Sequence, residues 1–314
     1  MHRTTEVHRT TGVHRTTGVH RTAGAHHTSE GALRMPTSSD FEHGGERSAA
    51  DGRDPAAQLA TRIRQRALEM IGLHGFGYLG QAMSSAELLA TLFSGPYRPD
   101  TDDLVLSPGH YVVAAYAAGA ELGLIDEAEL ATYGRDASRL PAIGSEESPI
   151  VDLTCGSLGQ GLSGALGFAI ANRLAGRPAW TYAFLSDGEL QEGQVWEAAM
   201  AAPHHDVRTL IVLLDCNGSQ VDGQVSDVMS IEPVPEKWAA FGWDVFELDG
   251  HDTVDIASAL AEAQRSPAPA VLVARTSPTR GLEELEHTVD AHFIKISPED
   301  SARVHESLEA RLAP

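Results

Sequence analysis

Cysteine is nearly absent from this sequence of 314 residues, which contains only Cys155 and Cys216. Neither has a neighbouring cysteine or a metal-binding spacing, so we expect two reduced core thiols of a cytosolic protein rather than a disulfide framework. Long apolar runs and a signal peptide are also missing, which argues against a membrane-spanning or secreted protein. Basic residues are few: 23 Lys and Arg stand against 44 Asp and Glu, giving a formal net charge of −21. This balance disfavours nucleic acid and anionic membranes as partners.

The first 54 residues lack the apolar pattern of a folded domain. A six-residue repeat beginning Val-His-Arg-Thr occupies residues 7–12, 13–18 and 19–24. Such a repeat cannot bury a core, so we expect a disordered, low-complexity extension over residues 1–54. Its regular histidines leave metal binding open as an alternative, and Met35 is an alternative start of the protein.

An alternation of apolar strands and helices begins near Pro55, with a first helix that has Arg62, Arg64 and Arg66 off its apolar face. Two short apolar runs, residues 180–185 and 209–214, indicate buried strands joined by a helix over residues 192–202. Strand, crossover helix and strand form a unit in which both strands are parallel. Further helices are expected over residues 84–93, 108–122, 126–134, 162–174, 234–241, 253–264 and 298–312, and further strands over residues 103–107, 243–248 and 270–274. The glycine-rich segment 74–84 should be a loop, with Ser84 or Ser85 capping the helix that follows. The pattern predicts one α/β domain over residues 55–314, with a mostly parallel sheet and helices on both faces.

Polar residues follow the two neighbouring strands at the point where each strand ends. Asp187 and Asn217 therefore lie where open α/β sheets bind ligands. A carboxylate, an amide oxygen and a backbone carbonyl are hard ligands suited to a Mg²⁺ ion that also holds phosphates. Gly188 lets the backbone approach closely, and the helix after it presents free N–H groups to an anion. The sequence thus predicts a metal–diphosphate site.

The segment Ser186-Asp-Gly, with Asn217 thirty residues after Asp187, resembles the thiamine-diphosphate motif. The surrounding sequence is more similar to the transketolase family. The matching blocks keep the family's order and cover residues 106–110, 155–163, 187–200, 217–223, 236–243 and 249–252. Together they span roughly residues 56–295.

The resemblance implies thiamine diphosphate and Mg²⁺ as cofactors. By resemblance, the metal is held by the side chains of Asp187 and Asn217 and the carbonyl of Ser219. The implied cofactor-binding residues are His110, Gly156, Leu158, Asp187, Gly188, Glu189, Asn217, Val221 and His292. His287 is an alternative to His292 as the late histidine on the diphosphate. The resemblance also implies catalytic roles for His110 and Glu192, with Glu192 at a subunit interface. Apart from the implied cofactor contact of Glu189, we expect Glu189 and Glu197 to be surface or capping carboxylates.

Some family residues are replaced around the expected substrate pocket. Tyr78 stands where transketolases have a histidine, and residues 140–144 lack the histidine usual there. Pro108 replaces a Lys or Arg. These changes cast doubt on ordinary pentose phosphates as substrates.

Transketolases transfer a two-carbon ketol unit, and the glutamate that activates the cofactor belongs to a second, pyrimidine-binding domain. The chain ends soon after the first domain, so the resemblance implies the N-terminal subunit of a split transketolase. We expect it to pair with a separate C-terminal subunit in a cytoplasmic α₂β₂ heterotetramer. One alternative is an acyl or ketol transferase that uses a 2-oxo acid such as pyruvate, and another is a non-catalytic cofactor-binding protein. A nicotinamide-binding protein is disfavoured because no Gly-x-Gly-x-x-Gly directly follows a first strand.

Overall fold

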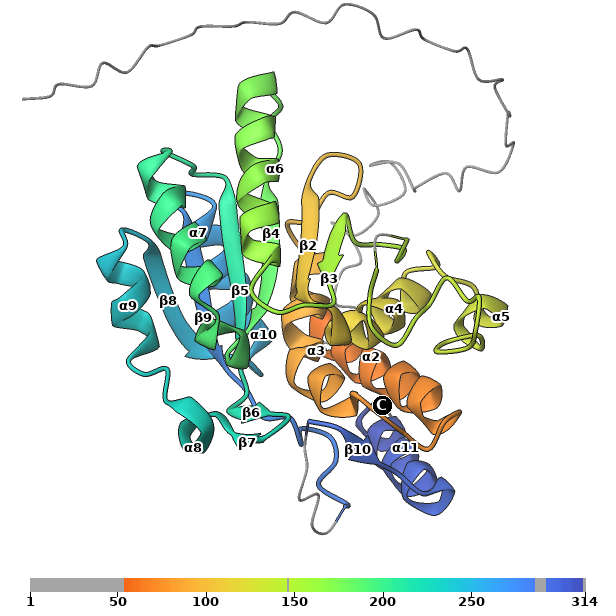
Figure 1. Cartoon of the computed structure of the whole chain (residues 1–314). Helices are drawn as coiled ribbons and strands as arrows, with labels where there is room; N and C mark the ends of the chain where they lie inside the picture. The colour runs from red at the N-terminus through yellow and green to blue at the C-terminus, as the bar shows by residue number, and fades with distance from the viewer. Residues whose placement is uncertain (1–53, 146, 286–291, 313–314) are drawn as a thin grey trace, which may run out of the picture. The chain divides into compact units, whose positions relative to one another are not determined.

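The computed structural model describes residues 54–145, 147–285 and 292–312, and a parallel sheet runs through this part of the chain (Figure 1). The sheet has six strands in the order β3-β2-β4-β5-β9-β8. They are β2 (Asp103–Pro108), β3 (Leu153–Cys155), β4 (Thr181–Ser186), β5 (Leu210–Cys216), β8 (Asp244–Asp249) and β9 (Ala270–Arg275). Every neighbouring pair is parallel. The α/β prediction is confirmed, whereas the predicted extension lies outside the described residues except for Asp54.

Helices cover both faces of the sheet (Figure 1). The first face carries α2 (Pro55–Gly72), α3 (Leu79–Ser94), α4 (Val112–Glu121), α10 (Thr253–Ala263) and α11 (Pro298–Leu312). The second carries α6 (Gly161–Ala175), α7 (Gly193–His204) and α9 (Val234–Ala240). In β4, Tyr182 and Phe184 enter the first core and Ala183 and Leu185 the second. Because strand side chains alternate between faces, a strand buried on both sides must be apolar throughout, as the sequence indicated.

Short elements connect these layers. They are β1 (Phe76–Gly77), α5 (Glu127–Leu130), β6 (Ser219–Gln220), β7 (Gly223–Gln224), α8 (Val225–Met229), β10 (Ile294–Lys295) and the 3₁₀ turns η2 (Gly109–Tyr111) and η3 (Gly188–Gln191). The helix expected over residues 126–134 is therefore reduced to α5. No helix among the described residues is long and apolar enough to cross a membrane.

Local sequence fixes several helix ends. Asp54 caps α2 because its carboxylate accepts the N–H of Ala56 at 2.9 Å, and Pro55 occupies the first helical position. Asp252 caps α10 in the same way through the N–H groups of Val254 and Asp255. These boundaries agree with the sequence prediction.

The start of α3 was predicted wrongly. We expected a loop up to Ser84 and a cap at Ser84 or Ser85, but the helix begins at Leu79 and both serines lie inside it. Every residue of α3 through Phe93 is buried, so tertiary packing outweighs the glycine-rich composition. Ser85 donates to the carbonyl of Gln81 at 2.5 Å instead of capping a helix.

Arg64 also departs from the prediction, which placed it off the apolar face of α2. Its side chain is buried and donates to both carboxylate oxygens of Glu87, at 2.8 and 2.5 Å. The same guanidinium donates to the carbonyl of Met83 at 2.7 Å. Arg64 therefore joins α2 to α3 through a buried ion pair.

Candidate functional site

Two loops meet at the carboxyl ends of β4 and β5. The strands are adjacent and parallel, with Ser186 paired to Asp215. Asp187 follows β4, and its Oδ1 accepts the N–H of Gly188 at 2.7 Å. Its Oδ2 accepts the N–H of Gly218, in the loop after β5, at 2.6 Å. The carboxylate of Asp187 thus bridges the two loops, and the predicted parallel pairing of β4 and β5 is confirmed.

The charge of Asp187 is held in an unfavourable environment. Burial raises the pKa of Asp187 to about 7, and the nearby Asp215 adds to the rise, although the N–H groups of Gly218 and Gly188 oppose it. Burying a carboxylate is costly unless a cation or further donors compensate it. A bound cation would offset this cost.

Asn217 is held at both ends of its amide. Its Nδ2 donates to Asp215 Oδ2 at 3.0 Å and to the hydroxyl of Tyr111 at 3.1 Å, with Ser84 Oγ at 3.3 Å. Its Oδ1 accepts the N–H of Ser219 at 2.9 Å. The oxygens of Asp187 and Asn217 therefore turn toward successive N–H groups of the same loop, those of Gly218 and Ser219.

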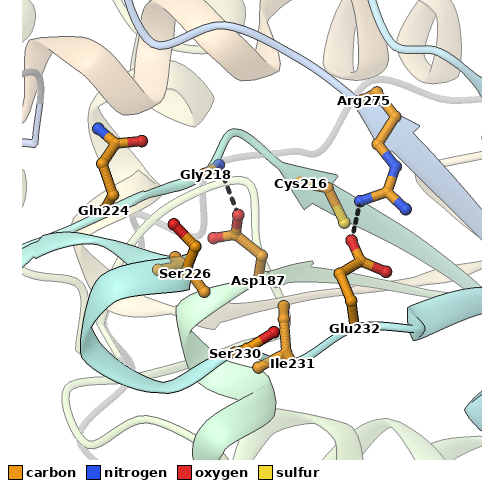
Figure 2. Close-up of a pocket in the computed structure, with 10 residues that line it drawn as sticks. Asp187, Cys216, Gly218, Gln224, Ser226, Ser230, Ile231, Glu232 and Arg275 are labelled. Atoms are coloured by element: carbon orange, nitrogen blue, oxygen red, sulfur yellow. Dashed lines mark hydrogen bonds and ion pairs between the residues drawn. The ribbon is translucent and has the colours of Figure 1, made fainter.

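Asp187 lines a cavity of about 160 Å³ between the strand ends and the segment around α8. Figure 2 shows its carboxylate among the lining side chains, with the bond to Gly218 drawn. On the opposite side of this hollow, Arg275 forms an ion pair with Glu232 at 2.6 Å, and the thiol of Cys216 also faces the space. Cys155 and Cys216 are both free, as expected, but only Cys216 is a core thiol, because Cys155 is half-buried in β3.

A second cluster contains the predicted histidines. His110 lies in η2, and its ring centroid is 5.1 Å from that of His292 and 5.1 Å from that of Tyr78. Gln81 Nε2 lies 2.8 Å from His292 Nδ1. Burial, with a smaller contribution from His292, lowers the pKa of His110 to about 3, so its imidazole is neutral at pH 7. The structure brings His110 and His292 together, whereas His287 lies outside the described residues.

Glu189 is not the surface carboxylate that we expected. It is fully buried, and its Oε1 accepts the hydroxyl of Ser107 and, at 2.7 Å, the N–H of Gly159. Burial raises its pKa to about 7. The residue turns inward because the loop before α6 passes over it, a contact between distant segments that local sequence does not reveal. Glu192 and Glu197 are exposed.

The other predicted cofactor residues lie on loops around this edge. Gly156 is exposed and Leu158 half-buried in the loop between β3 and α6. Ser219 is buried in β6, which pairs antiparallel with β7. Val221, at the tip of this hairpin, is 68% exposed, so its side chain is available to a ligand or to another subunit.

Gly161, the first residue of α6, allows a close approach that no other residue permits. A Cβ at this position would lie 2.4 Å from the Cβ and 2.5 Å from the Cα of Ser107. We expect Gly161→Ala to lower the free energy of unfolding by about 1–3 kcal/mol, because the helix must move away from β2. At Gly167, in the same helix, an added Cβ would meet no atom within 4 Å, so Gly167→Ala should be neutral or stabilise by up to about 1 kcal/mol. Urea denaturation of both variants checks this, and equal effects would contradict it.

Comparison with known proteins identifies this arrangement. The family described as transketolase, thiamine diphosphate binding domain, matches residues 56–310. The chain belongs to the transketolase family. This transketolase-family chain is 39% identical to a putative transketolase family protein, y4mO, of Sinorhizobium fredii, over 81% of this chain and 95% of that protein. It is 38% identical to the 6-deoxy-6-sulfo-D-fructose transketolase subunit SqwG of a Clostridium species, over 76% and 91% of the two chains.

Solved transketolases share the fold but are longer. The structure from Campylobacter jejuni superposes with a TM-score of 0.75 at 27% identity, and that from Leishmania mexicana with 0.73 at 29%. Each match covers 82% of this transketolase-family chain but only 43% and 41% of the solved chains. The chain thus spans less than half of these transketolases, yet most of the length of a relative named as a subunit.

Sequence reasoning missed three residues of this site: Ser84, Tyr111 and Asp215. All three are buried and contact Asn217. The signal for Asp215 was present, because a carboxylate ends an otherwise apolar strand two residues before the predicted ligand. Ser84 and Tyr111 carried no such signal, since their contacts join segments far apart in sequence.

Proposed function

We propose that this chain is the thiamine-diphosphate- and Mg²⁺-binding subunit of a two-component transketolase that transfers a two-carbon ketol unit. The observation that carries the proposal is the convergence of Asp187 and Asn217 on one loop at the ends of adjacent strands. A carboxylate with a raised pKa, an amide oxygen and the nearby Ser219 carbonyl form an all-oxygen donor set, which fits Mg²⁺.

The residues fit the diphosphate as well as the metal. In the proposed complex, Asp187, Asn217 and the Ser219 carbonyl hold the ion. His110 and His292 face the diphosphate, with Gly156, Leu158, Gly188, Glu189 and Val221 completing the contacts. The neutral imidazole of His110 donates an N–H to a phosphate oxygen without needing to be protonated. Bound thiamine diphosphate would supply a thiazolium ring whose deprotonated C2 can add to a carbonyl carbon and whose ring can take up the electrons of the bond that breaks.

In this proposal, the residues of the chain bind the metal and the cofactor and hold them in position. Asp187 offsets the metal's charge, and the buried cluster around Asn217 keeps water from competing for the amide.

The proposed partner is a separate C-terminal subunit in a cytoplasmic α₂β₂ assembly. Two relatives support a split enzyme. One is SqwG, and the other is an apulose-4-phosphate transketolase subunit of Actinobacillus succinogenes, which is 34% identical over 69% of this chain and 82% of that relative. We propose that Glu192, which is exposed, lies at the interface with the C-terminal subunit.

One observation favours a second donor class, a 2-oxo acid such as pyruvate. Tyr78 packs against His110 and, edge-on, against His292 and Phe293, at centroid distances of 5.1, 5.8 and 5.2 Å. An aromatic wall beside these histidines offers fewer hydrogen bonds to sugar hydroxyls than a polar one. A short donor without sugar hydroxyls would lose fewer hydrogen bonds there than a phosphorylated ketose.

Mixing this chain with the candidate C-terminal subunit, thiamine diphosphate and Mg²⁺ tests the function. We expect neither subunit to be active alone. With an aldose acceptor for the two-carbon unit, the mixture should release glyceraldehyde 3-phosphate from xylulose 5-phosphate or transfer a ketol unit from another ketose. Release of CO₂ from pyruvate, without ketose turnover, would instead support the second donor class. Turnover by this chain alone would contradict the two-component proposal.

A further inference from the structure

Asp215 is the most densely hydrogen-bonded carboxylate in the described part of the site. It ends β5 and is completely buried. Its Oδ2 accepts the hydroxyl of Ser84 at 2.6 Å and that of Tyr111 at 2.7 Å, while its Oδ1 accepts the hydroxyl of Thr276. These donors come from α3, η2 and the loop after β9. None of the family motifs that indicated the site includes Asp215.

The two hydroxyls on Oδ2 also face Asn217. A serine or tyrosine hydroxyl has a single proton. Since Ser84 and Tyr111 both donate that proton to Asp215, only their lone pairs remain for Asn217. The Nδ2 group of Asn217 therefore faces three acceptors, namely Asp215 Oδ2 and the two hydroxyl oxygens.

This arrangement determines which end of the Asn217 amide points to the loop. Were the amide turned over, its oxygen would face the Asp215 carboxylate and two hydroxyls whose protons are already engaged. That contact would be repulsive and would leave buried groups unpaired. The orientation found, with Oδ1 toward the N–H of Ser219, avoids both costs.

We infer that Asp215 is a positioning residue that keeps the oxygen of Asn217, and not its nitrogen, directed at the metal. The inference rests on the proposed function, in which Asn217 Oδ1 binds Mg²⁺. Groups that orient metal ligands typically change metal affinity 10–100-fold when they are removed. Asp215 acts through Asn217 and touches neither metal nor substrate.

A double-mutant cycle on the full chain tests this role. Mg²⁺ is titrated by calorimetry at saturating thiamine diphosphate for the wild type, Asp215→Ala, Asn217→Ala and the double variant. We expect Asp215→Ala to weaken Mg²⁺ binding about 10–100-fold. In the Asn217→Ala background, the same change should have little further effect, because the ligand on which Asp215 acts is gone.

A merely structural role gives a different result. Equal losses in both backgrounds, or an unchanged affinity in Asp215→Ala, would overturn the inference while the proposed function stands. A wild-type chain that binds no thiamine diphosphate with Mg²⁺, even with its partner, would overturn the proposed function and the inference with it.

A second, milder pair of variants decides the matter if Asp215→Ala does not fold. Ser84→Ala removes a hydroxyl that contacts both Asp215 and Asn217, and alanine suits the helix interior. We expect Mg²⁺ affinity to fall about 3–10-fold, and the loss to vanish in the Asn217→Ala background. Ser85→Ala is the matched control, because among the residues that the structure describes this equally buried hydroxyl bonds only to the carbonyl of Gln81 in its own helix. Equal effects of the two serine variants would contradict the inference.

Discussion

Replacing Asp187 by alanine should weaken the binding of thiamine diphosphate with Mg²⁺ by at least about 100-fold, which corresponds to about 2.8 kcal/mol. The carboxylate is the one charged ligand that the protein contributes to the proposed donor set, and without it the protein offers the ion only neutral oxygens. The same change removes the acceptor for the N–H of Gly218, so the loop that carries Asn217 and Ser219 loses its tie to β4. Both effects weaken the binding of the metal and the cofactor.

Calorimetry of the full chain measures this loss, and Asp222→Ala provides a control. Asp222 is an exposed carboxylate in the turn between β6 and β7, so its removal changes the net charge by the same amount near the same site. We expect the Asp222 variant to bind like the wild type. An Asp187→Ala variant with wild-type affinity would exclude Asp187 as a ligand.

The second large effect concerns stability. The carboxylate of Glu87 accepts hydrogen bonds from two nitrogens of the Arg64 guanidinium and also lies 3.0 Å from His251 Nδ1. His251 Nε2 accepts the N–H of Ser277, so Nδ1 carries the proton that is donated to Glu87. Removing Glu87 leaves the buried guanidinium of Arg64 unpaired. Glu87→Ala should therefore lower the free energy of unfolding by about 3–5 kcal/mol.

The same residue makes stability depend on pH. Burial alone would raise the pKa of Glu87, but the hydrogen bond from His251 and the ion pair with Arg64 outweigh it and lower the pKa to about 2. Because the unfolded chain keeps the ordinary, higher pKa, the unfolded state binds more protons between these values. The contribution of Glu87 is thus fully present above the unfolded pKa and is lost as pH falls toward 2.

Urea denaturation between pH 2 and 6 checks this prediction. Glu87→Gln should remove part of the acid dependence that the wild type shows. Arg139→Ala breaks an exposed ion pair with Glu129 and should change the free energy of unfolding by no more than about 1 kcal/mol. An unchanged acid slope in Glu87→Gln would show that Glu87 is not ionised in the folded state at low pH.

The sequence was sufficient to predict the sheet and the strand ends at which Asp187 and Asn217 lie close together. The apolar runs that became β4 and β5 are long enough to be buried and are separated by one helix, which leaves little choice but a parallel pair. Once that pair is fixed, Asp187 and Asn217 must emerge at the same edge. Local sequence therefore predicted that these two residues meet, and their binding of a metal stays a prediction.

Long-range partners explain what the sequence could not reveal. Arg64 looked like a solvated residue because its partner Glu87 lies on another helix. Glu189 looked like a surface carboxylate because Ser107 and Gly159 reach it from distant segments. In each case a polar side chain is buried by a pairing that has no local periodicity, and only the assembled fold supplies the pair.

Tyr78 illustrates the opposite case, because its departure from the family pattern was visible in the sequence. The residue lies beside His110 and His292, the two histidines proposed to face the diphosphate.

A crystal structure of the chain with its partner subunit, thiamine diphosphate and Mn²⁺, analysed for anomalous scattering, tests the central claim most directly. The account predicts one manganese peak bounded by the Asp187 carboxylate, Asn217 Oδ1 and the Ser219 carbonyl, with the diphosphate on its other side. A diphosphate bound elsewhere, or a manganese ion that contacts neither Asp187 nor Asn217, would contradict it.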